Sequence, residues 1–462
     1  MDDTPLEELP AVPEVTGGRH PIYPSLSKKV DVRCDNQQGR YVVAVEDIEP
    51  GDTICAEKPY AAVLLRDMFG THCQNCFKIV KAPFPCKKCS NVVFCSVECR
   101  ESAYFHSFEC PIQDLLVGSG MSINCFLAIR LLVQKPLSYF LGIKEEINTG
   151  RYKEALKARE TYDPADFFRL YDLVCHSEQR TKEDFFHRVV MVVFLVKALK
   201  KTKYFEDKGT GISDTISDTE AYVGSLLMHF LEIVQFNSHE VSEFWLMGPK
   251  TLSGSKNEAM GAAIYPTLAL FNHSCITGQV RYFSGNSAIT KSIRFIPKGD
   301  PVPENYGQSF TSAVRSERRQ YLMDRYWFEC ACEACLRDWP MYQHMTNAVL
   351  NFKCRKCSGP LPVNTETHMN PMLKCEKCGE QTNIMSSLKN LQNSEQTFKS
   401  ATNEMENFNL EKAESLLLEN LKQLESSLYP PYKDYHQTQE AYMRVMLTKG
   451  GNYRVKQPKS EE

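Results

Sequence analysis

The sequence has little net charge and no long hydrophobic run. Its 462 residues carry 54 Lys and Arg against 57 Asp and Glu, a formal net charge of −3. Proteins that coat nucleic acid or bind membrane surfaces usually have long basic runs, and this chain has none. Its longest apolar stretch, 189–199, is too short to span a membrane. Residues 1–13 lack the basic and apolar blocks of a signal peptide. We therefore expect a multidomain protein of the cytoplasm and nucleus, without membrane or direct nucleic-acid contact.

Cysteine, in contrast, is abundant, at 19 residues. In a reducing compartment these residues are thiols or zinc ligands rather than disulfides. The first cluster combines cysteines two or three residues apart with one histidine, the donor set of two tetrahedral zinc ions: Cys73, Cys76, Cys86, Cys89, Cys95, Cys99, His106 and Cys110. Near the C-terminus, two pairs have the spacing of a zinc ribbon: Cys354 with Cys357, and Cys375 with Cys378.

A third group, Cys330-x-Cys332-x2-Cys335, lies between these two clusters. Other cysteines lack partners at a suitable spacing and are expected to be small buried hydrophobes: Cys34, Cys55, Cys125 and Cys175. His72 precedes Cys73 but fills no vacant ligand position, so we expect it at the surface.

Periodicity divides the chain into strand-rich and helical parts. Residues 29–65 alternate β-branched and small side chains around a Glu49-Pro50-Gly51 turn, as short strands do. From about 112 to 236 the apolar period is helical. Strand-like composition returns at 262–265, 279–283 and 289–296. A charged helix is expected over 312–326, and helical hairpins from 385 onward.

The order of these motifs resembles the SET and MYND domain-containing protein lysine methyltransferases. The resemblance rests on Gly39-Arg40, the two-zinc cluster, the helical insert, Asn272-His273-Ser274-Cys275, Tyr306-Gly307 and the Cys330 group. Gly39-Arg40-Tyr41, the zinc ribbon and residues 432–439 make the fourth branch of this family, with its insect relatives, the most similar. The C-terminal helical region is short for that branch, so we expect a trimmed or incomplete member.

The resemblance implies an α+β fold with a SET-type β core. We expect a flexible lead (1–27), two parts of the SET core (28–70 and 251–311), a MYND zinc finger (73–110) and a helical insert (111–250). A post-SET zinc site (312–340), a zinc ribbon (350–382) and a C-terminal helical repeat-like region (383–462) complete the expected order.

The resemblance also implies chemistry for individual residues. The methyl group of S-adenosylmethionine must be presented in line to a neutral lysine amine, so positioning and desolvation are the protein's main work. Tyr306 matches the catalytic tyrosine that orients the amine, and Tyr326 with Phe328 would complete an aromatic lysine channel, although core packing explains these two rings as well. The positions that match cofactor-binding residues of the family are Gly39, Arg40, Asn237, Asn272, His273 and Tyr306.

Zinc is the second cofactor that the resemblance implies. Cys275 matches the cysteine that shares one zinc with Cys330, Cys332 and Cys335, which would tie the cofactor segment to the channel. In the finger we expect the ligand pairs of the two zinc ions to alternate along the chain. One ion would bind Cys73, Cys76, Cys95 and Cys99, and the other Cys86, Cys89, His106 and Cys110.

Two departures from the family leave an alternative open. Pro301 and Pro303 stand where the family has a proline-free acidic strand, and each proline removes a backbone donor. Tyr41 adds a side chain beside the expected cofactor. The alternative to a methyltransferase acting on histone or non-histone protein is therefore a catalytically silent scaffold that recruits partners through the finger and the C-terminal helices.

Other reaction classes fit less well. DNA binding is disfavoured, because a solvated surface explains the lysines near the finger equally well. A hydrolase is disfavoured because adjacent side chains of a strand point to opposite faces, so His273 and Ser274 do not form a base and nucleophile pair. The expected partners are a lysine-containing protein and a proline-rich peptide at the finger, with the chain itself monomeric.

Overall fold

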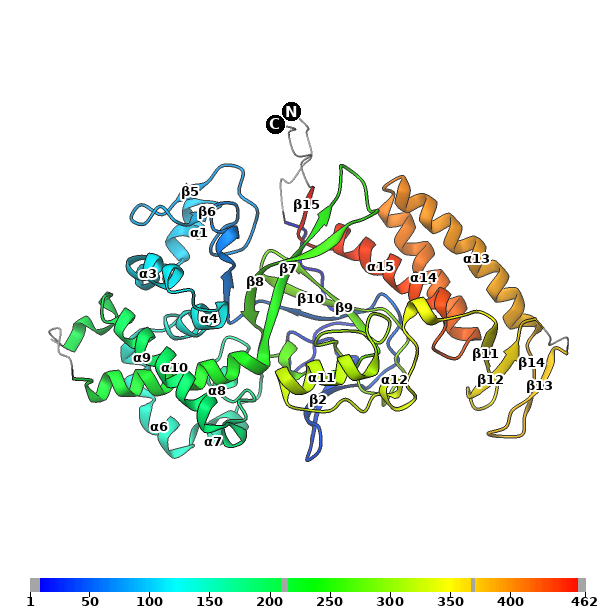
Figure 1. Ribbon diagram of the computed structural model, residues 1–462, viewed down its shortest axis with the longest axis horizontal. Helices are drawn as coiled ribbons and strands as arrows, with labels where there is room; N and C mark the ends of the chain where they lie inside the picture. The colour runs from blue at the N-terminus through cyan, green and yellow to red at the C-terminus, as the bar shows by residue number, and fades with distance from the viewer. Residues whose placement is uncertain (1–8, 209–214, 367–369, 456–462) are drawn as a thin grey trace.

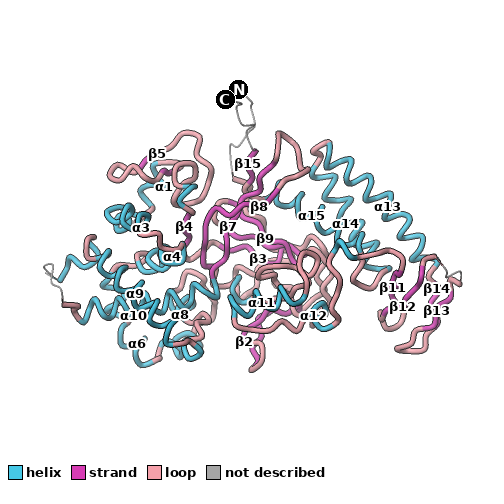
Figure 2. Tube along the Cα trace, in the orientation of Figure 1, coloured by secondary structure: helices cyan, strands magenta, loops and turns pink. Residues whose placement is uncertain are grey.

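The computed structural model describes residues 9–208, 215–366 and 370–455. Helices gather at both ends of the molecule around a strand-rich centre (Figures 1 and 2). One end holds the finger (residues 73–110) and the helical insert. The other holds helices α13 to α15 and the strands of the ribbon. No helix within the described ranges is long and apolar enough to cross a membrane.

Three small sheets form the centre, which we call the β core. β1 (Val30–Asp35) pairs with β2 (Gly39–Ala44), and β3 (Thr53–Glu57), β10 (Ser287–Ser292) and β9 (Gln279–Ser284) form a second sheet. The third sheet has the order β15-β7-β8-β4, from Tyr453–Val455, Ser238–Leu246, Lys256–Ile264 and Ala61–Leu64. The strands predicted over 29–65, 262–265 and 279–283 are confirmed, and the one predicted over 289–296 is confirmed as far as Ser292, where β10 ends. Residues 238–246, expected within the helical insert, form β7 instead.

The segment with two prolines lies against β2 without losing its hydrogen bonds. Val302 N donates to Val42 O over 2.9 Å, and Glu304 N donates to Asn272 O over 3.0 Å. Pro301 and Pro303 alternate with these donors, so neither proline occupies a position whose backbone N–H would donate one of these hydrogen bonds. The expected distortion is limited to a loss of regular strand geometry, with single bridges such as Val43 to Pro301.

The lead is packed over its described part, residues 9–27, rather than flexible. Thr16 N donates to Thr53 O, and Ser27 N donates to Ile54 O over 2.8 Å. Val15 and Leu26 are buried at 3% and 0% exposure. A short stretch of apolar and hydroxyl side chains is enough to cover the edge of β3, which composition alone does not reveal.

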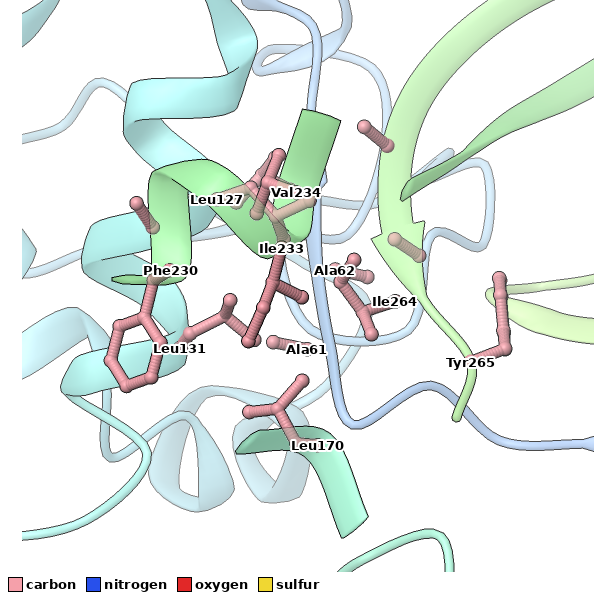
Figure 3. Close-up of a cluster of buried hydrophobic side chains, with 14 of the residues drawn as sticks. Ala61, Ala62, Leu127, Leu131, Leu170, Phe230, Ile233, Val234, Ile264 and Tyr265 are labelled. Atoms are coloured by element: carbon pink, nitrogen blue, oxygen red, sulfur yellow. The ribbon is translucent and has the colours of Figure 1, made fainter. Parts of the chain in front are cut away.

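The helical insert packs against β4 and β8. Two long helices, α9 (Lys182–Leu199) and α10 (Asp218–Asn237), begin at the caps Thr181 and Ser217. In Figure 3, Leu131, Phe230 and Ile233 meet the strand residues Ala61 and Ile264 in one buried cluster. The shorter helices are α3 (Gln113–Gly118), α4 (Ile123–Leu132), α5 (Leu137–Gly142), α6 (Lys144–Thr149), α7 (Tyr152–Lys157) and α8 (Phe167–Tyr171).

The finger has little secondary structure: β5 (Phe84–Pro85), β6 (Val93–Phe94), α1 (Val97–Ser102) and α2 (His106–Glu109). His72, expected at the surface, is fully buried, and its Nε2 lies 3.1 Å from Glu243 Oε2 on β7. This pair joins the base of the finger to the β core. Arg130 makes a second buried bridge, through two hydrogen bonds to Glu109.

The C-terminal part has its own hydrophobic cluster. Helices α13 (Met385–Glu406), α14 (Leu410–Ser427) and α15 (Lys433–Gly450) pack side by side, with Leu417, Leu421 and Tyr442 fully buried. The ribbon is built from β11 (Val349–Lys353), β12 (Pro360–Asn364), β13 (Met372–Lys374) and β14 (Gln381–Asn383). α11 (Arg315–Tyr326) and α12 (Glu333–Leu336) connect it to the β core.

Candidate active site and metal groups

Tyr306 is the centre of an aromatic cluster. Its ring centroid lies 5.0 Å from that of Tyr326, 6.5 Å from that of Phe328 and 5.4 Å from that of His273. The hydroxyl donates to the carbonyl of Phe271 over 2.5 Å. Burial raises the pKa of Tyr306 well above its ordinary value, so the hydroxyl keeps its proton at neutral pH. The structure thus brings together the residue predicted to be catalytic and both predicted channel residues.

His273 connects this cluster to the Cys275 group. The backbone N–H of Tyr306 donates to His273 Nδ1 over 3.0 Å, so the proton of the neutral ring belongs on Nε2. Nε2 lies 3.4 Å from Cys275 Sγ and is placed to donate to it. A single imidazole therefore contacts both the candidate catalytic residue and a candidate metal ligand.

The cysteines predicted to share the post-SET zinc converge although 55 residues separate Cys275 from Cys330. Cys275 Sγ lies 3.8 Å from Cys330 Sγ and 3.5 Å from Cys335 Sγ, and Cys332 belongs to the same group. These separations match the roughly 3.8 Å edge of a tetrahedron with zinc–sulfur bonds of about 2.3 Å. Arg318, 1% exposed, donates to Cys335 Sγ over 3.4 Å and offsets the negative charge of the thiolates.

The finger and the ribbon supply three further groups of the same kind. Cys76 and Cys95 lie 3.6 Å apart, as do Cys354 and Cys378, and Cys89 Sγ is 3.5 Å from His106 Nε2. Within each group all ligand atoms lie within 4.8 Å of one another: Cys73, Cys76, Cys95, Cys99; Cys86, Cys89, His106, Cys110; and Cys354, Cys357, Cys375, Cys378. This grouping is the interleaved one expected from the sequence, and each donor set suits zinc.

The segment that carries Asn272 approaches the turn between β1 and β2. Asn272 Nδ2 donates to Gln38 O over 3.0 Å, which brings it beside Gly39. Gly39 has φ 65°, and no heavy atom lies within 4 Å of the position that a Cβ would take. This left-handed, open backbone suits close approach of a ligand.

Arg40 and Asn237 both hydrogen-bond to the same loop. Arg40 Nη2 donates to Asp172 O over 2.7 Å, and its Nη1 lies 3.2 Å from the Asp172 carboxylate. Asn237 Nδ2 donates to Val174 O over 2.7 Å. The loop 172–177 therefore stands between two predicted cofactor-binding residues. Asp172 and Val174 gave no signal in the sequence, because their role depends on contacts with distant segments.

Two buried acids stabilise the loops of this site. Glu57 on β3 accepts from Thr267 N and Leu268 N, each over 2.8 Å, at the start of the turn that leads to Phe271. Burial raises the pKa of Glu57 to about 7. Glu304 forms an ion pair with Arg281, and its Oε2 lies 3.6 Å from His239 Nε2.

The four cysteines without a predicted ligand role differ in their environments. Cys55 and Cys125 are buried, as expected. Cys34 is exposed, and Cys175 is half-buried beside His229 and Glu232 of α10. Spacing could not reveal this last group, since Cys175 lies in a loop far from α10 in the sequence.

Comparison with known proteins is consistent with the finger and the order of motifs. The MYND finger family model matches residues 73–110. Protein-lysine N-methyltransferase SMYD4 of Pongo abelii is 25% identical over 447 residues, which cover 80% of this chain and 53% of that protein. The corresponding protein of Homo sapiens is 24% identical, covering 79% and 53%. This chain therefore spans about half the length of these relatives.

A SET and MYND domain-containing protein of Dictyostelium discoideum is 24% identical, with 76% of this chain and 95% of that protein covered. Among solved structures, Rubisco LSMT bound to AdoMet is similar over 91% of this chain and 88% of that chain, at 12% identity and a TM-score of 0.30.

Proposed function

We propose that this chain, a relative of the SET and MYND domain-containing proteins, is an S-adenosylmethionine-dependent protein-lysine N-methyltransferase. The observation that carries the proposal is the position of Tyr306. Its hydroxyl is protonated, held by the Phe271 carbonyl, and surrounded by Tyr326, Phe328 and His273. The curated relatives named as protein-lysine N-methyltransferases support the same reaction.

The residues of the chain fit the bound groups of such an enzyme. When bound, S-adenosylmethionine supplies an electrophilic methyl group. Gly39, Arg40, Asn237, Asn272 and His273 would hold it, because these three separate segments are joined by hydrogen bonds to the open turn at Gly39 and to the loop 172–177. Tyr306 would orient the lysine amine, and the rings of Tyr326 and Phe328 would surround the lysine stem and exclude water.

We also propose four structural zinc ions, one in each cysteine group. The ion on Cys275, Cys330, Cys332 and Cys335 would fix the distance between the Asn272 segment and the channel residues that precede Cys330. Thiolate ligands persist in reducing compartments, which supports the cytoplasm and nucleus as locations. A lysine-containing protein is the proposed substrate, a proline-rich peptide the proposed ligand of the finger, and the monomer the proposed state.

Two measurements test the enzyme against the silent scaffold. Calorimetry on the zinc-loaded chain should detect S-adenosylmethionine binding, and transfer of a tritiated methyl group to a broad peptide and lysate set should detect turnover. Cofactor binding without transfer to any substrate would favour the scaffold. Absence of cofactor binding by the folded, zinc-loaded chain would contradict the proposed function.

A further inference from the structure

A half-buried thiol lies in the loop between Arg40 and Asn237. Cys175 Sγ, a His229 ring nitrogen and a Glu232 carboxylate oxygen all lie within 4.8 Å of one another. Cys175 follows α8, whereas His229 and Glu232 project from α10. The arrangement contains a nucleophile, a base and an acid that none of the proposed methyl-transfer steps uses.

The hydrogen bonds of His229 fix its proton. Its Nε2 lies 2.9 Å from the carbonyl oxygen of Tyr171, and a carbonyl can only accept, so Nε2 must carry the hydrogen. In the neutral ring Nδ1 is therefore bare and able to take the thiol proton of Cys175. The same Nδ1 lies 3.9 Å from Glu232 Oε2, which stabilises the imidazolium once it forms.

The surroundings also favour the thiolate. The Ser177 hydroxyl lies 3.3 Å from Cys175 Sγ and 2.7 Å from Glu232 Oε2, so its proton is available to either anion. Above all, the hydrogen bond with His229 lowers the pKa of Cys175 to about 7. The phenols of Tyr152 and Tyr171 also face the thiol, and burial raises both pKa values, so neither adds charge at neutral pH.

A metal ion is a weaker interpretation of the same residues. Arg180 Nε lies 3.3 Å from Glu232 Oε1, and its side chain is almost fully buried. A fixed guanidinium beside the only carboxylate of the group opposes a divalent cation and instead holds Glu232 in place. Arg180 also donates to the Cys175 carbonyl over 2.8 Å, which fixes the backbone that carries the thiol.

We propose that Cys175 is a peroxide-reactive thiol whose oxidation to a sulfenic acid weakens the cofactor site. The thiolate sulfur attacks one oxygen of hydrogen peroxide or an organic hydroperoxide, and a sulfur–oxygen bond forms as the oxygen–oxygen bond breaks. The electron pair of that bond leaves with the second oxygen, which takes the proton from the His229 imidazolium as water or alcohol. Sulfur is oxidised and the peroxide is reduced.

The effect on the cofactor site follows from the position of the loop and rests on the proposed function. Asp172 holds Arg40 and Val174 holds Asn237, within three residues of Cys175 on the same loop. An added oxygen on Sγ needs space and polar partners that His229 and Ser177 now fill. Moving these two side chains would shift the loop and with it the hydrogen bonds that hold Arg40 and Asn237.

The test begins with the thiol alone. The zinc-loaded full chain is treated with limiting hydrogen peroxide at pH 7 in the presence of a dione trap, and labelled peptides are quantified by mass spectrometry. We expect Cys175 to react at least about tenfold faster than the exposed Cys34. His229→Gln should slow Cys175 about tenfold, and the surface control His187→Gln should not. Equal rates at Cys175 and Cys34, or no effect of His229→Gln in a folded, zinc-loaded variant, would overturn the proposal.

Three further readouts separate a structural role of Cys175 from a chemical one. Alkylation of Cys175 by iodoacetamide should have its pH midpoint near 7, and His229→Gln should move that midpoint upward, because it removes the hydrogen bond that lowers the pKa of Cys175. Zinc content should not exceed four per chain, and a fifth zinc that Cys175→Ser loses would establish a metal site instead.

In calorimetry, peroxide should lower S-adenosylmethionine affinity at least about fivefold in wild type but not in Cys175→Ser. No binding before oxidation contradicts the proposed function only, whereas unchanged affinity after oxidation contradicts the coupling.

Discussion

The hydroxyl of Tyr306 donates to the carbonyl of Phe271 across 2.5 Å, directly before Asn272. This bond joins the candidate catalytic residue to the segment that carries two predicted cofactor-binding residues. Because the ring of Tyr306 also contacts Tyr326, the same side chain sets the position of the lysine channel relative to the cofactor segment.

Removal of that hydroxyl should separate catalysis from binding. Tyr306→Phe keeps the ring, the zinc content and S-adenosylmethionine affinity, and lowers methyl transfer about tenfold to a thousandfold, the range for loss of one positioned polar group. The measurement is incorporation of tritiated methyl. Tyr104→Phe, at an exposed ring of the finger, is the matched control and should keep wild-type activity. Equal incorporation by wild type and Tyr306→Phe would remove Tyr306 from the mechanism.

Asn272→Ala should weaken cofactor binding by about 1–3 kcal/mol, because it removes the amide that holds the Gln38 carbonyl beside Gly39. Calorimetry on the zinc-loaded protein measures this loss. Asn403→Ala, on the exposed side of α13, should bind the cofactor as wild type does. An unchanged affinity for Asn272→Ala would show that the Gly39 turn does not depend on this amide.

Elemental analysis should find four zinc ions per folded chain, and two or fewer would contradict the proposed metal groups. Single substitutions should then have different effects. Cys330→Ser disrupts the group next to His273, so it should remove one zinc and abolish cofactor binding. Cys354→Ser should also remove one zinc, but the ribbon packs with a separate hydrophobic cluster, so cofactor affinity should remain within about twofold of wild type.

Glu57 should make stability depend on pH. Its pKa is about 7 in the folded protein and near 4.5 when unfolded, so the folded state binds the proton more tightly. The stabilising contribution is complete below pH 4.5 and is lost as pH rises through 7, by at most about 3 kcal/mol. Denaturant unfolding between pH 5 and 8 should therefore have a flatter pH slope for Glu57→Gln than for wild type. The exposed control Glu178→Gln should keep the wild-type slope, and identical slopes for Glu57→Gln and wild type would exclude this role.

The pair His72 and Glu243 should be essential for the attachment of the finger. His72→Ala leaves a buried carboxylate without its imidazole partner, which typically costs about 3–5 kcal/mol. Chemical denaturation compared with the exposed control His344→Ala measures the difference. A loss below about 1 kcal/mol would mean that Arg454, 3.4 Å from the other oxygen of Glu243, is sufficient by itself.

The correct predictions for the metal groups came mainly from the short intervals between cysteines in the sequence. Cysteines two residues apart belong to one centre, so the grouping of the finger and ribbon ligands could be read from short intervals. His72 shows the limit of this reading, since its partner lies 171 residues further along the chain on β7. The sequence predicts a buried hydrophobe at Cys175 for the same reason, because the neighbouring His229 and Glu232 come from α10.

The prolines show a second limit. A proline pair predicts a distorted strand when every N–H is assumed to be needed. In the structure Val302 and Glu304 carry the donors, and Pro301 and Pro303 take the alternate positions. Only every second residue of a strand donates its N–H to a given neighbour, so a proline at the other positions removes no hydrogen bond. Which positions these are depends on the register with β2, and composition does not give that register.

The last described strand has a consequence for synthesis. β15 pairs in parallel with β7, Tyr453 beside Phe244, and the Asn452 side chain bonds both backbone groups of Gly285. A ribosome delivers β7 long before β15, and until then β7 is an open edge of the sheet. Open edges pair readily with other strands, so we expect the nascent chain to be most prone to pairing with its neighbours until β15 has emerged and covered β7.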